Sequence, residues 1–437
     1  LKETIATQVA KNKKTTMRKT LPIIAFLLSV ALQVCAQQKN YDFQEGKLFY
    51  KITDATKQYV QVTTELDELL EATGTLYNSP IKGDVAIPAN VNYQGKQYTV
   101  TGIGDNAFGG CTQVTSVSMP ASITSLGEQV FLSCTGLKRI TVDSNNTVLK
   151  DVDGVLFDKS GNKLIAYPNM RATNYDIPEG TVELGAASFF MCNEIKNINF
   201  PPTLKKIGML AFGICSKMNE VTIPENVTDL GDFAFYNCTG LEKAIIKANI
   251  SELKRYMFSR CTALKEVSLP STIEFIRTWA FGSCAAMKNI KLPDNLKGIE
   301  AEAFNGCETL SEITLPASLE QIGMYTFDGC KQLKCITCLR DTPLKGAAMG
   351  AGVFENVDKI ACELKVPKGH RNEYAEAEQW GDFTRISEHD LSGISTIISQ
   401  DSNTQTTIFT INGQRLPNNT QPSHGIYIIN GKKVCVK

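Results

Sequence analysis

The chain has 437 residues, of which 45 are basic and 45 acidic, so its formal net charge at pH 7 is zero. Apolar residues make up 43% and charged residues 21%, which is typical of folded proteins and excludes wholesale disorder. Because no basic surplus is available to neutralise phosphates, we do not expect the chain to coat nucleic acid. Its length predicts two or three domains or an elongated repeat.

The N-terminal segment predicts export. Met17, which two basic residues follow, is the expected initiator, so residues 1–16 would be an upstream extension. Leu21–Val34 is an uncharged run, too short for a comfortable membrane span and typical of the apolar part of a signal peptide. Cleavage is expected after Ala36, with lipidation at Cys35 as the alternative. The mature chain is expected to have no membrane span.

A tetrapeptide, Phe-x-x-Cys, recurs through the middle of the chain. From Phe189 to Phe327 every step is 23 residues, and the step from Phe108 to Phe131 is the same. The gap from Phe131 to Phe189 is 58 residues, which is two steps and 12 further residues. The phenylalanines are Phe108, Phe131, Phe189, Phe212, Phe235, Phe258, Phe281, Phe304 and Phe327. The cysteines are Cys111, Cys134, Cys192, Cys215, Cys238, Cys261, Cys284, Cys307 and Cys330. A unit this short cannot bury its apolar face alone, so the units are predicted to stack into a solenoid.

Each unit predicts a strand followed by a compact turn. Val267 and Leu269 alternate, so both face one side of a strand that Pro270 ends. Ile273 and Ile276 lie three residues apart, as in a turn of α- or 3-10 helix. The sequence therefore predicts an α/β repeat, with a parallel sheet on one side and short helical or 3-10 turns on the other. One continuous parallel sheet is expected from the strands before Pro120, Pro201, Pro224, Pro270, Pro293 and Pro316.

The A-F-x-x-C and I-x-L-P elements resemble the leucine-rich repeats of the BspA type, which occur in surface proteins of bacteria and protists. The resemblance covers about Asp84 to Asp390. It implies a leucine-rich-repeat solenoid that is secreted or held at the bacterial cell surface, associated with the outer membrane. It also implies adhesion to host extracellular proteins or to other cells.

Two departures from the repeat spacing predict inserted hairpins. The first coil carries extra residues near 92–100, where the chain alternates in polarity. The second is the 12-residue surplus near 151–168, where two β-rich runs flank the turn at Asp158–Gly161. The repeats are assigned to residues 84–361, and residues 37–83 are predicted to form an N-terminal β cap that covers the first coil.

The C-terminal part predicts a cap, a linker and a small module. Residues 362–390 should add one last strand and a helix over 369–380 that buries Trp380, and their V-P-K-G and W-G-D-F motifs match the family's terminal unit. Residues 391–407 have the polar composition of a linker. In residues 408–437, two Asn-Gly pairs between β-rich runs predict a small all-β module. It resembles the C-terminal sorting or attachment tails of exported Gram-negative proteins, which implies contact with secretion machinery.

The recurrent cysteines are expected to be buried free thiols rather than disulfides. Nine equivalent positions cannot all pair with one another, and free cysteine packs as a small apolar side chain. Cys335 and Cys338 have metal-site spacing but lie on a predicted strand, where residues three apart point to opposite faces. If a disulfide forms, Cys338 with Cys362 in the neighbouring coil is the favoured pair.

Catalytic and metal chemistry find no support in the motifs. The three histidines lie outside the repeats, without a zinc-protease motif or a nearby nucleophile motif. Asp151–Gly154 lacks the remaining ligands of a calcium loop and is interpreted as a turn. We therefore predict a non-enzymatic protein with no catalytic residues, cofactor or metal.

The outward strand positions are the candidate binding surface. The position between the two inward residues carries Ser118, Thr141, Asn199, Thr222, Ser268, Lys291 and Thr314. The position two residues earlier carries Glu220, Glu266, Asn289 and Glu312. These residues either form a merely solvated sheet face or recognise a macromolecule, namely host or cell-surface proteins or glycans. A glycan-binding accessory protein for polysaccharide uptake would need clustered exposed Trp or Tyr, and a hydrolase would need an acid/base pair.

Overall fold

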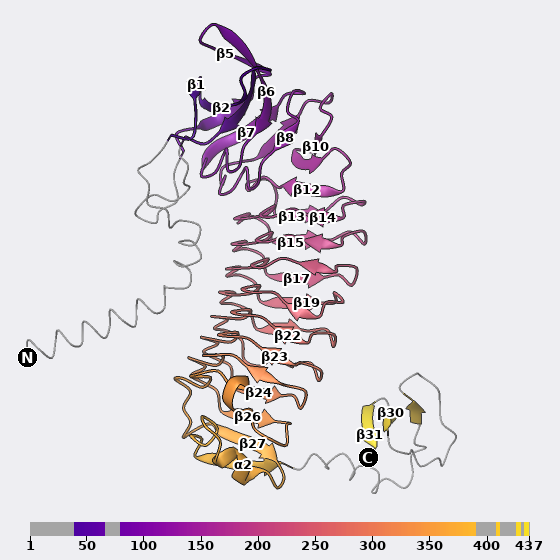
Figure 1. Ribbon diagram of the computed structural model, residues 1–437. Helices are drawn as coiled ribbons and strands as arrows, with labels where there is room; N and C mark the ends of the chain where they lie inside the picture. The colour runs from indigo at the N-terminus through magenta and orange to yellow at the C-terminus, as the bar shows by residue number, and fades with distance from the viewer. Residues whose placement is uncertain (1–38, 66–78, 390–407, 411–424, 430–431, 437) are drawn as a thin grey trace, which may run out of the picture.

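The computed structural model describes residues 39–65, 79–389, 408–410, 425–429 and 432–436. Figure 1 shows an elongated stack of coils, with the N-terminal strands at one end and α2 (Arg371–Ala375) at the other. Within the described residues the chain is mostly strand and turn, and the only helices are α2 and the 3-10 helix η1 (Gly346–Ala348). The predicted leucine-rich-repeat solenoid is confirmed.

The strands before the repeat prolines pair in parallel, as predicted, but they do not form one continuous sheet. They fall into four ladders. The first ladder contains β4 (Lys82–Ala86), β7 (Gln113–Met119) and β9 (Arg139–Val142), and the second contains β13 (Asn174–Asp176) and β15 (Asn197–Asn199). The third contains β17 (Glu220–Ile223), β19 (Lys243–Ile246) and β21 (Glu266–Ser268). The fourth contains β24 (Glu312–Leu315), β26 (Cys335–Cys338), β27 (Glu363–Pro367) and β28 (Arg385–His389). The inserted residues separate the first two ladders, and the coil before Pro293 forms no strand.

The other side of each coil is not helical, which corrects the prediction. Two-residue strands stack there in parallel, and tight turns follow them. The strands are β8 (Ser125–Leu126), β14 (Glu183–Leu184), β16 (Lys206–Ile207), β18 (Asp229–Leu230), β20 (Glu252–Leu253), β22 (Phe275–Ile276), β23 (Gly298–Ile299) and β25 (Gln321–Ile322). Residues such as Leu210 and Ile214 have φ values of 56° and 62°, which a right-handed helix does not allow. The backbone N–H groups of this turn donate hydrogen bonds to carbonyls of the next coil instead. For example, the Phe212 N–H donates to the Ala234 carbonyl at 2.8 Å.

Antiparallel strands cover the first coil and fill both insertions. β1 (Phe43–Glu45), β2 (Leu48–Asp54) and β3 (Tyr59–Thr63) form a meander, and β3 runs parallel to β6 (Lys96–Ile103). β5 (Asn90–Tyr93) and β6 form a hairpin where the first insertion was expected. β10 (Leu149–Val152), β11 (Val155–Asp158) and β12 (Lys163–Ala166) form the second excursion, and β12 then pairs in parallel with β14. The second excursion therefore rejoins the turn side of the solenoid.

A column of stacked aromatic rings runs through the core. From Phe189 to Phe327 successive ring centroids lie 4.9–5.8 Å apart, and all these rings are fully buried. Tyr167 extends the column at one end, 4.8 Å from Phe189, and Phe354 extends it at the other, 5.9 Å from Phe327. Sequence reasoning missed both, because neither begins a Phe-x-x-Cys tetrapeptide.

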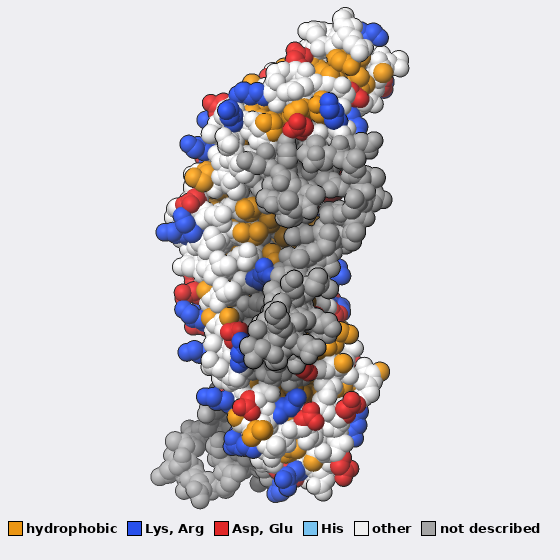
Figure 2. All heavy atoms as spheres, turned by 90° about the vertical axis from the view of Figure 1, so that its left-hand side faces the viewer, with side chains coloured by type: hydrophobic (Ala, Val, Ile, Leu, Met, Phe, Trp, Pro, Cys, Tyr) orange, Lys and Arg blue, Asp and Glu red, His pale blue; other side chains and the backbone are white. Residues whose placement is uncertain are grey.

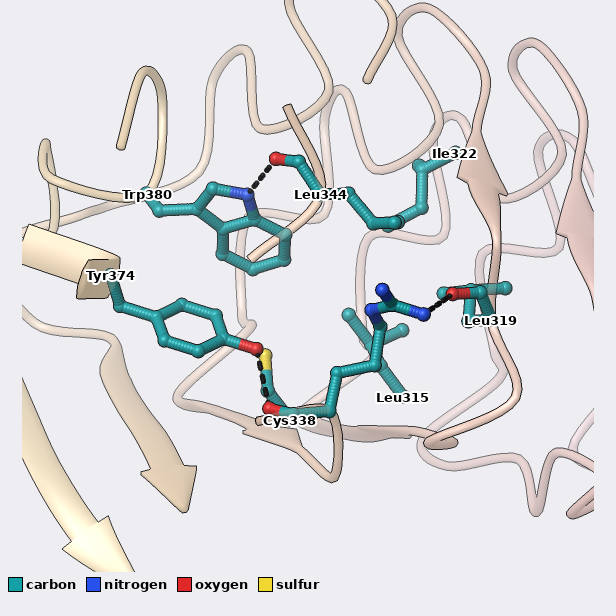
Figure 3. Close-up of a pocket in the computed structure, with 8 residues that line it drawn as sticks. Leu315, Leu319, Ile322, Cys338, Leu344, Tyr374 and Trp380 are labelled. Carbon is teal, nitrogen blue, oxygen red and sulfur yellow. Dashed lines mark hydrogen bonds between the residues drawn. The ribbon is translucent and has the colours of Figure 1, made fainter. Parts of the chain in front are cut away.

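A small cap closes the C-terminal end of the column. Figure 3 shows two of its side chains, Tyr374 and Trp380. Trp380 packs edge-on against Phe354 at 5.0 Å and donates from Nε1 to the Leu344 carbonyl at 3.0 Å. The Tyr374 hydroxyl donates to the Arg340 carbonyl at 2.9 Å. The helix that presents Tyr374 is shorter than the predicted 369–380, because turns replace it after Ala375. The void between these residues measures about 10 Å³, room for at most about one water molecule.

The tail contributes three antiparallel strands, β29 (Ile408–Thr410), β30 (Gly425–Ile429) and β31 (Lys432–Val436). The predicted upstream extension and signal peptide, residues 1–36, lie outside the described residues, and so does the predicted linker 391–407. Neither described helix is long and apolar enough to cross a membrane.

Candidate functional site: the exposed strand face

The strand register places the predicted surface residues in two rows. In the inner row Ser118 pairs with Thr141, and Thr222 lies beside Ile245, which lies beside Ser268. The outer row, two residues earlier on each strand, places Lys243 between Glu220 and Glu266. The rows arise because a strand alternates its side chains and because adjacent coils pair without a shift along most of the sheet.

Most of these side chains face solvent. Ser118 and Thr141 are half-buried, as is Ile245. The remaining predicted residues are exposed: Asn199, Thr222, Ser268, Lys291, Thr314, Glu220, Glu266, Asn289 and Glu312. Lys291 and Asn289 lie on the coil that forms no strand, so their backbone is outside the ladders although their side chains are exposed.

The inner row continues into the C-terminal cap, which sequence reasoning did not include in the surface. Thr337 pairs with Lys365, and Lys365 pairs with Ser387. The Ser387 hydroxyl donates to the Glu363 carboxylate at 2.6 Å. The sequence does indicate this continuation, because the L-K-V-P motif at Leu364–Pro367 of the cap repeats the strand-proline pattern of the coils. The strand face therefore ends at β28.

Opposite charges lie side by side on neighbouring coils of the face. Lys243 Nζ lies 2.9 Å from Glu266 Oε2, and a side-chain hydrogen bond with that carboxylate, together with its charge, raises the pKa of Lys243. Further out, Lys265 Nζ lies 3.0 Å from Glu242 Oε2. The same intermixing of acidic and basic side chains extends over the flank seen in Figure 2. Because neither sign dominates, the face is suited to polar complementarity rather than to bulk attraction of a charged partner.

The first two ladders carry small polar groups that bond across coils. Thr115 and Ser116 donate from their hydroxyls to Asp84 Oδ1 at 2.7 and 2.6 Å. Hydrogen bonds, first from Ser116 and then from Thr115, lower the pKa of Asp84. The Asn197 amide donates to Asn174 Oδ1 at 2.7 Å, and these bonds hold the side chains in place on an otherwise solvated surface.

The aromatic side chains outside the core do not form an open platform. Phe233, Tyr256 and Trp279 stack face to face on the turn side, with centroids 4.5 and 6.1 Å apart and planes within 5° of parallel. Stacking covers both faces of Tyr256 and one face each of Phe233 and Trp279. The other tryptophan, Trp380, is 2% exposed. Among the described aromatic side chains, Tyr59 and Tyr325 are exposed, at 38% and 39%, and they lie far apart, in β3 and in the turn after β25.

The nine repeated cysteines are free thiols, as expected for the ladder, and so are Cys335, Cys338 and Cys362. The disulfide considered between Cys338 and Cys362 is not formed, which corrects that alternative. Glu363 pairs with Cys335 and Lys365 with Thr337, so Cys362 lies at the opposite end of the strand pair from Cys338. The four-residue offset is about 13 Å along a strand, and a disulfide needs Cα atoms within about 7 Å.

No group of three or more His, Cys, Asp or Glu side chains is arranged to hold a metal ion within the described residues. Asp153 and Gly154 form the turn between β10 and β11, and Asp151 accepts hydrogen bonds from the backbone N–H groups of Val142, at 2.8 Å, and Gly154. These groups stabilise a local turn, as expected for Asp151–Gly154.

Comparison with known families decides the assignment of the repeats. Six copies of the BspA type leucine rich repeat region match residues 89–162, 163–287 and 276–373. The chain belongs to this family. BspA type repeats thus account for the solenoid, its column of rings and its exposed strand face.

The chain is similar to solved structures of leucine-rich repeat proteins, and the first of those named here shares its fold. A leucine-rich repeat protein from Eubacterium ventriosum is 22% identical, covers 65% of this chain and 93% of its own, and has a TM-score of 0.51. One from Bacteroides ovatus is 24% identical, covers 68% and 94%, and has a TM-score of 0.29. The pneumococcal vaccine antigen PcpA is 17% identical, covers 79% and 98%, and has a TM-score of 0.45. No curated protein matches the chain.

Proposed function

We propose that this BspA type protein is an exported, non-enzymatic binding protein of the bacterial cell surface, and that its strand face adheres to a host or cell-surface protein. The observation that carries the proposal is the pair of exposed polar rows, which share one register over successive coils and continue through β28. The apolar strand residues point inward, so the rows are not needed to build the core.

The dimensions of the face support a protein partner. About ten coils lie between β13 and β28, which at roughly 4.8 Å per coil gives a length of roughly 40 Å. Strands of four residues are about 13 Å long. The face is therefore of the same order as the ~800 Å² that each partner buries in a standard protein interface. Its mixed charge and its lack of open aromatic rings favour a polar protein surface over a sugar.

Export is the second part of the proposal. The signal-peptide pattern before Gln37 supports translocation, and the family likeness supports a location at the cell surface. We assign the tail strands β29, β30 and β31 to contact with secretion machinery, because a compact hairpin module beyond the C-terminal cap adds nothing to the column of rings.

A binding panel tests the proposal. The chain beginning at Gln37 would be applied in parallel to immobilised extracellular-matrix proteins and to a glycan array. We expect saturable binding to at least one protein and none to the glycans. Binding confined to glycans would contradict the choice of partner class, and turnover of a glycan or peptide substrate would contradict the non-enzymatic assignment.

A further inference from the structure

The turn side of the solenoid contains a hollow of about 300 Å³ at the second insertion. Its near wall is the turn from Leu126 to Leu132, and its far wall runs from Gly185 to Phe190. Between them lies a shortened turn, of which Lys163, Ile165–Tyr167 and Asn169 line the hollow. In the neighbouring coils the aromatic ring lies five residues after the stacked strand residue, as Phe189 does after Leu184, whereas Tyr167 lies only three residues after Leu164. The turn of this coil is therefore two residues shorter, which leaves the space open.

The near wall carries main-chain donors that lack a partner. In regular coils the corresponding N–H groups donate to the next coil: Asn106 and Phe108 donate to the carbonyls of Glu128 and Val130, at 3.0 and 2.9 Å. One coil later the equivalent groups belong to Gln129 and Phe131. Neither N–H has a hydrogen-bond partner among the residues that the structure describes.

The far wall carries a second unsatisfied group. The Ser188 side chain is 2% exposed, and its Oγ has no hydrogen-bond partner in the described structure. Two carbonyls of this wall are already used, since the Tyr167 N–H donates to Ser188 at 2.8 Å and the Asn169 amide to Phe190 at 2.9 Å. A buried hydroxyl without a partner destabilises the folded state, so a ligand that bonds to it gains affinity.

The hollow has a defined width and a closed end. Its walls lie two coils apart, about 9.6 Å between backbones, and the shortened turn fills only part of the layer between them, so a short chain segment fits where that turn does not reach. At one end Ser133 Oγ contacts Met191 Sδ at 3.3 Å, which bridges the walls. Glu128 and Lys163 stand on its rim and oppose each other in sign, so a neutral ligand is favoured over a free anion.

We propose that this hollow binds an extended peptide segment of another protein, which completes the missing turn by main-chain hydrogen bonds. Its carbonyls accept from Gln129 and Phe131, and one of its polar groups bonds to Ser188. Recognition by addition of a chain to unpaired backbone groups is a general mode of peptide binding. The site is separate from the strand face and does not depend on the function proposed for that face.

The chain itself supplies a suitable probe. In the coil that follows, the carbonyls of Met209 and Ala211 accept from Ala187 and Phe189 at 2.9 and 2.8 Å. Ala187 and Phe189 are the equivalents of Gln129 and Phe131. A synthetic peptide with the sequence of residues 206–214, acetylated and amidated at its ends, presents the same carbonyls to the hollow. A scrambled peptide of the same composition is the control.

Amide hydrogen exchange on the full chain tests the proposal. In the free protein the amides of Gln129 and Phe131 should exchange at least about tenfold faster than those of Asn106 and Phe108, because they lack partners. Adding the 206–214 peptide at about millimolar concentration should slow their exchange at least about tenfold. The scrambled peptide should leave it unchanged.

Two variants make the result specific. Ala186→Trp adds an indole at the rim of the hollow and should abolish the protection, whereas Met209→Trp, at the equivalent exposed position one coil later, should preserve it. Unchanged exchange at Phe212 and Phe235 would show that both variants are folded. Protection already present in the free chain would mean that a segment of the chain fills the hollow, and protection that rises with protein concentration would mean a second copy. Each of these two results would overturn the proposal. So would a wild-type protein whose amide exchange does not slow when the peptide is added, or protection that persists in the Ala186→Trp variant.

Discussion

The thiol of Cys238 donates a hydrogen bond from Sγ to the main-chain carbonyl of Phe212, 3.0 Å away in the preceding coil. The same carbonyl accepts the N–H of Cys215 at 3.3 Å. Every repeated cysteine from Cys134 onwards thus does more than fill space, because it donates to a buried carbonyl of the coil before it. This accounts for a cysteine rather than a valine at the position.

The contact recurs along the solenoid at 3.0–3.4 Å. The pairs are Cys134 with Phe108, Cys215 with Phe189, Cys261 with Phe235, Cys284 with Phe258, Cys307 with Phe281 and Cys330 with Phe304. Cys192 instead donates to the carbonyl of Tyr167 at 3.7 Å, where the tyrosine takes the phenylalanine's place.

Removing one thiol donor should weaken the stack modestly. Cys284→Val keeps an apolar side chain of similar size but removes the bond to Phe258, so we expect a loss of about 1 kcal/mol in the free energy of unfolding. Urea unfolding measures it. Thr262→Val, an exposed change in the neighbouring turn, is the control. An unaltered Cys284→Val protein would show that the thiol serves only as packing.

Alkaline pH should destabilise the solenoid. Burial raises the pKa of Cys307 to about 12, and burial likewise raises the pKa of Cys192 well above its usual range. The folded state keeps these protons. The stability that each buried neutral thiol contributes is therefore complete below about pH 9 and is lost as the pH rises towards 12. Each such thiol then costs about 1.4 kcal/mol per pH unit. Thermal unfolding between pH 8 and 11 measures the trend, and Cys307→Val should make it shallower. Equal slopes for wild type and variant would refute this origin.

Truncating a ring in the column should be costly. Phe235 is fully buried between Phe212 and Phe258, at 5.2 and 5.5 Å. Phe235→Ala should lower the free energy of unfolding by roughly 3–5 kcal/mol and loosen the adjacent coils, seen as faster amide exchange there. Phe275→Ala, at a half-buried ring on the turn side, should cost clearly less. A loss below about 1 kcal/mol for Phe235→Ala would contradict the role of the column.

Removing the tail should separate stability from export. Trp380 and Phe383 already close the column on Phe354, at 5.0 and 5.1 Å. A chain ending at Ser392, which lies outside the described residues, should therefore melt at an unchanged temperature. Its display on the native cell surface, measured by antibody labelling, should fall. A lower melting temperature would make the tail part of the cap, and unchanged display would exclude a sorting role.

The repeat spacing predicted the column of rings, the buried thiols and the outward rows, because a fixed period forces equivalent residues into equivalent places. It could not distinguish helical turns from two-residue strands. Ile273 and Ile276 lie three apart in either arrangement, and both are fully buried. The repeat spacing did not predict that Tyr167 and Phe354 belong to the column, because each lacks the cysteine three residues later.

The remaining features depend on the path of the chain. The hollow beside Phe131 arises because the turn that contains Tyr167 is a few residues shorter than the turns of other coils. No sequence motif predicts this shortening. The donor role of the thiols depends on the position of a carbonyl in another coil. The repeated choice of cysteine, where Val357 suffices in the last coil, was the available signal.

Binding measurements on strand-face variants test the central claim most directly. A Thr222→Arg/Ser268→Arg/Thr314→Arg protein alters exposed residues of the inner row, and a Thr228→Arg/Ser251→Arg/Ser271→Arg protein adds the same charge at exposed positions elsewhere. Both would be titrated against the protein ligand found in the panel by surface plasmon resonance. The account predicts at least about tenfold weaker binding for the first variant, with wild-type affinity for the second. Equal affinity for both variants and wild type would contradict it.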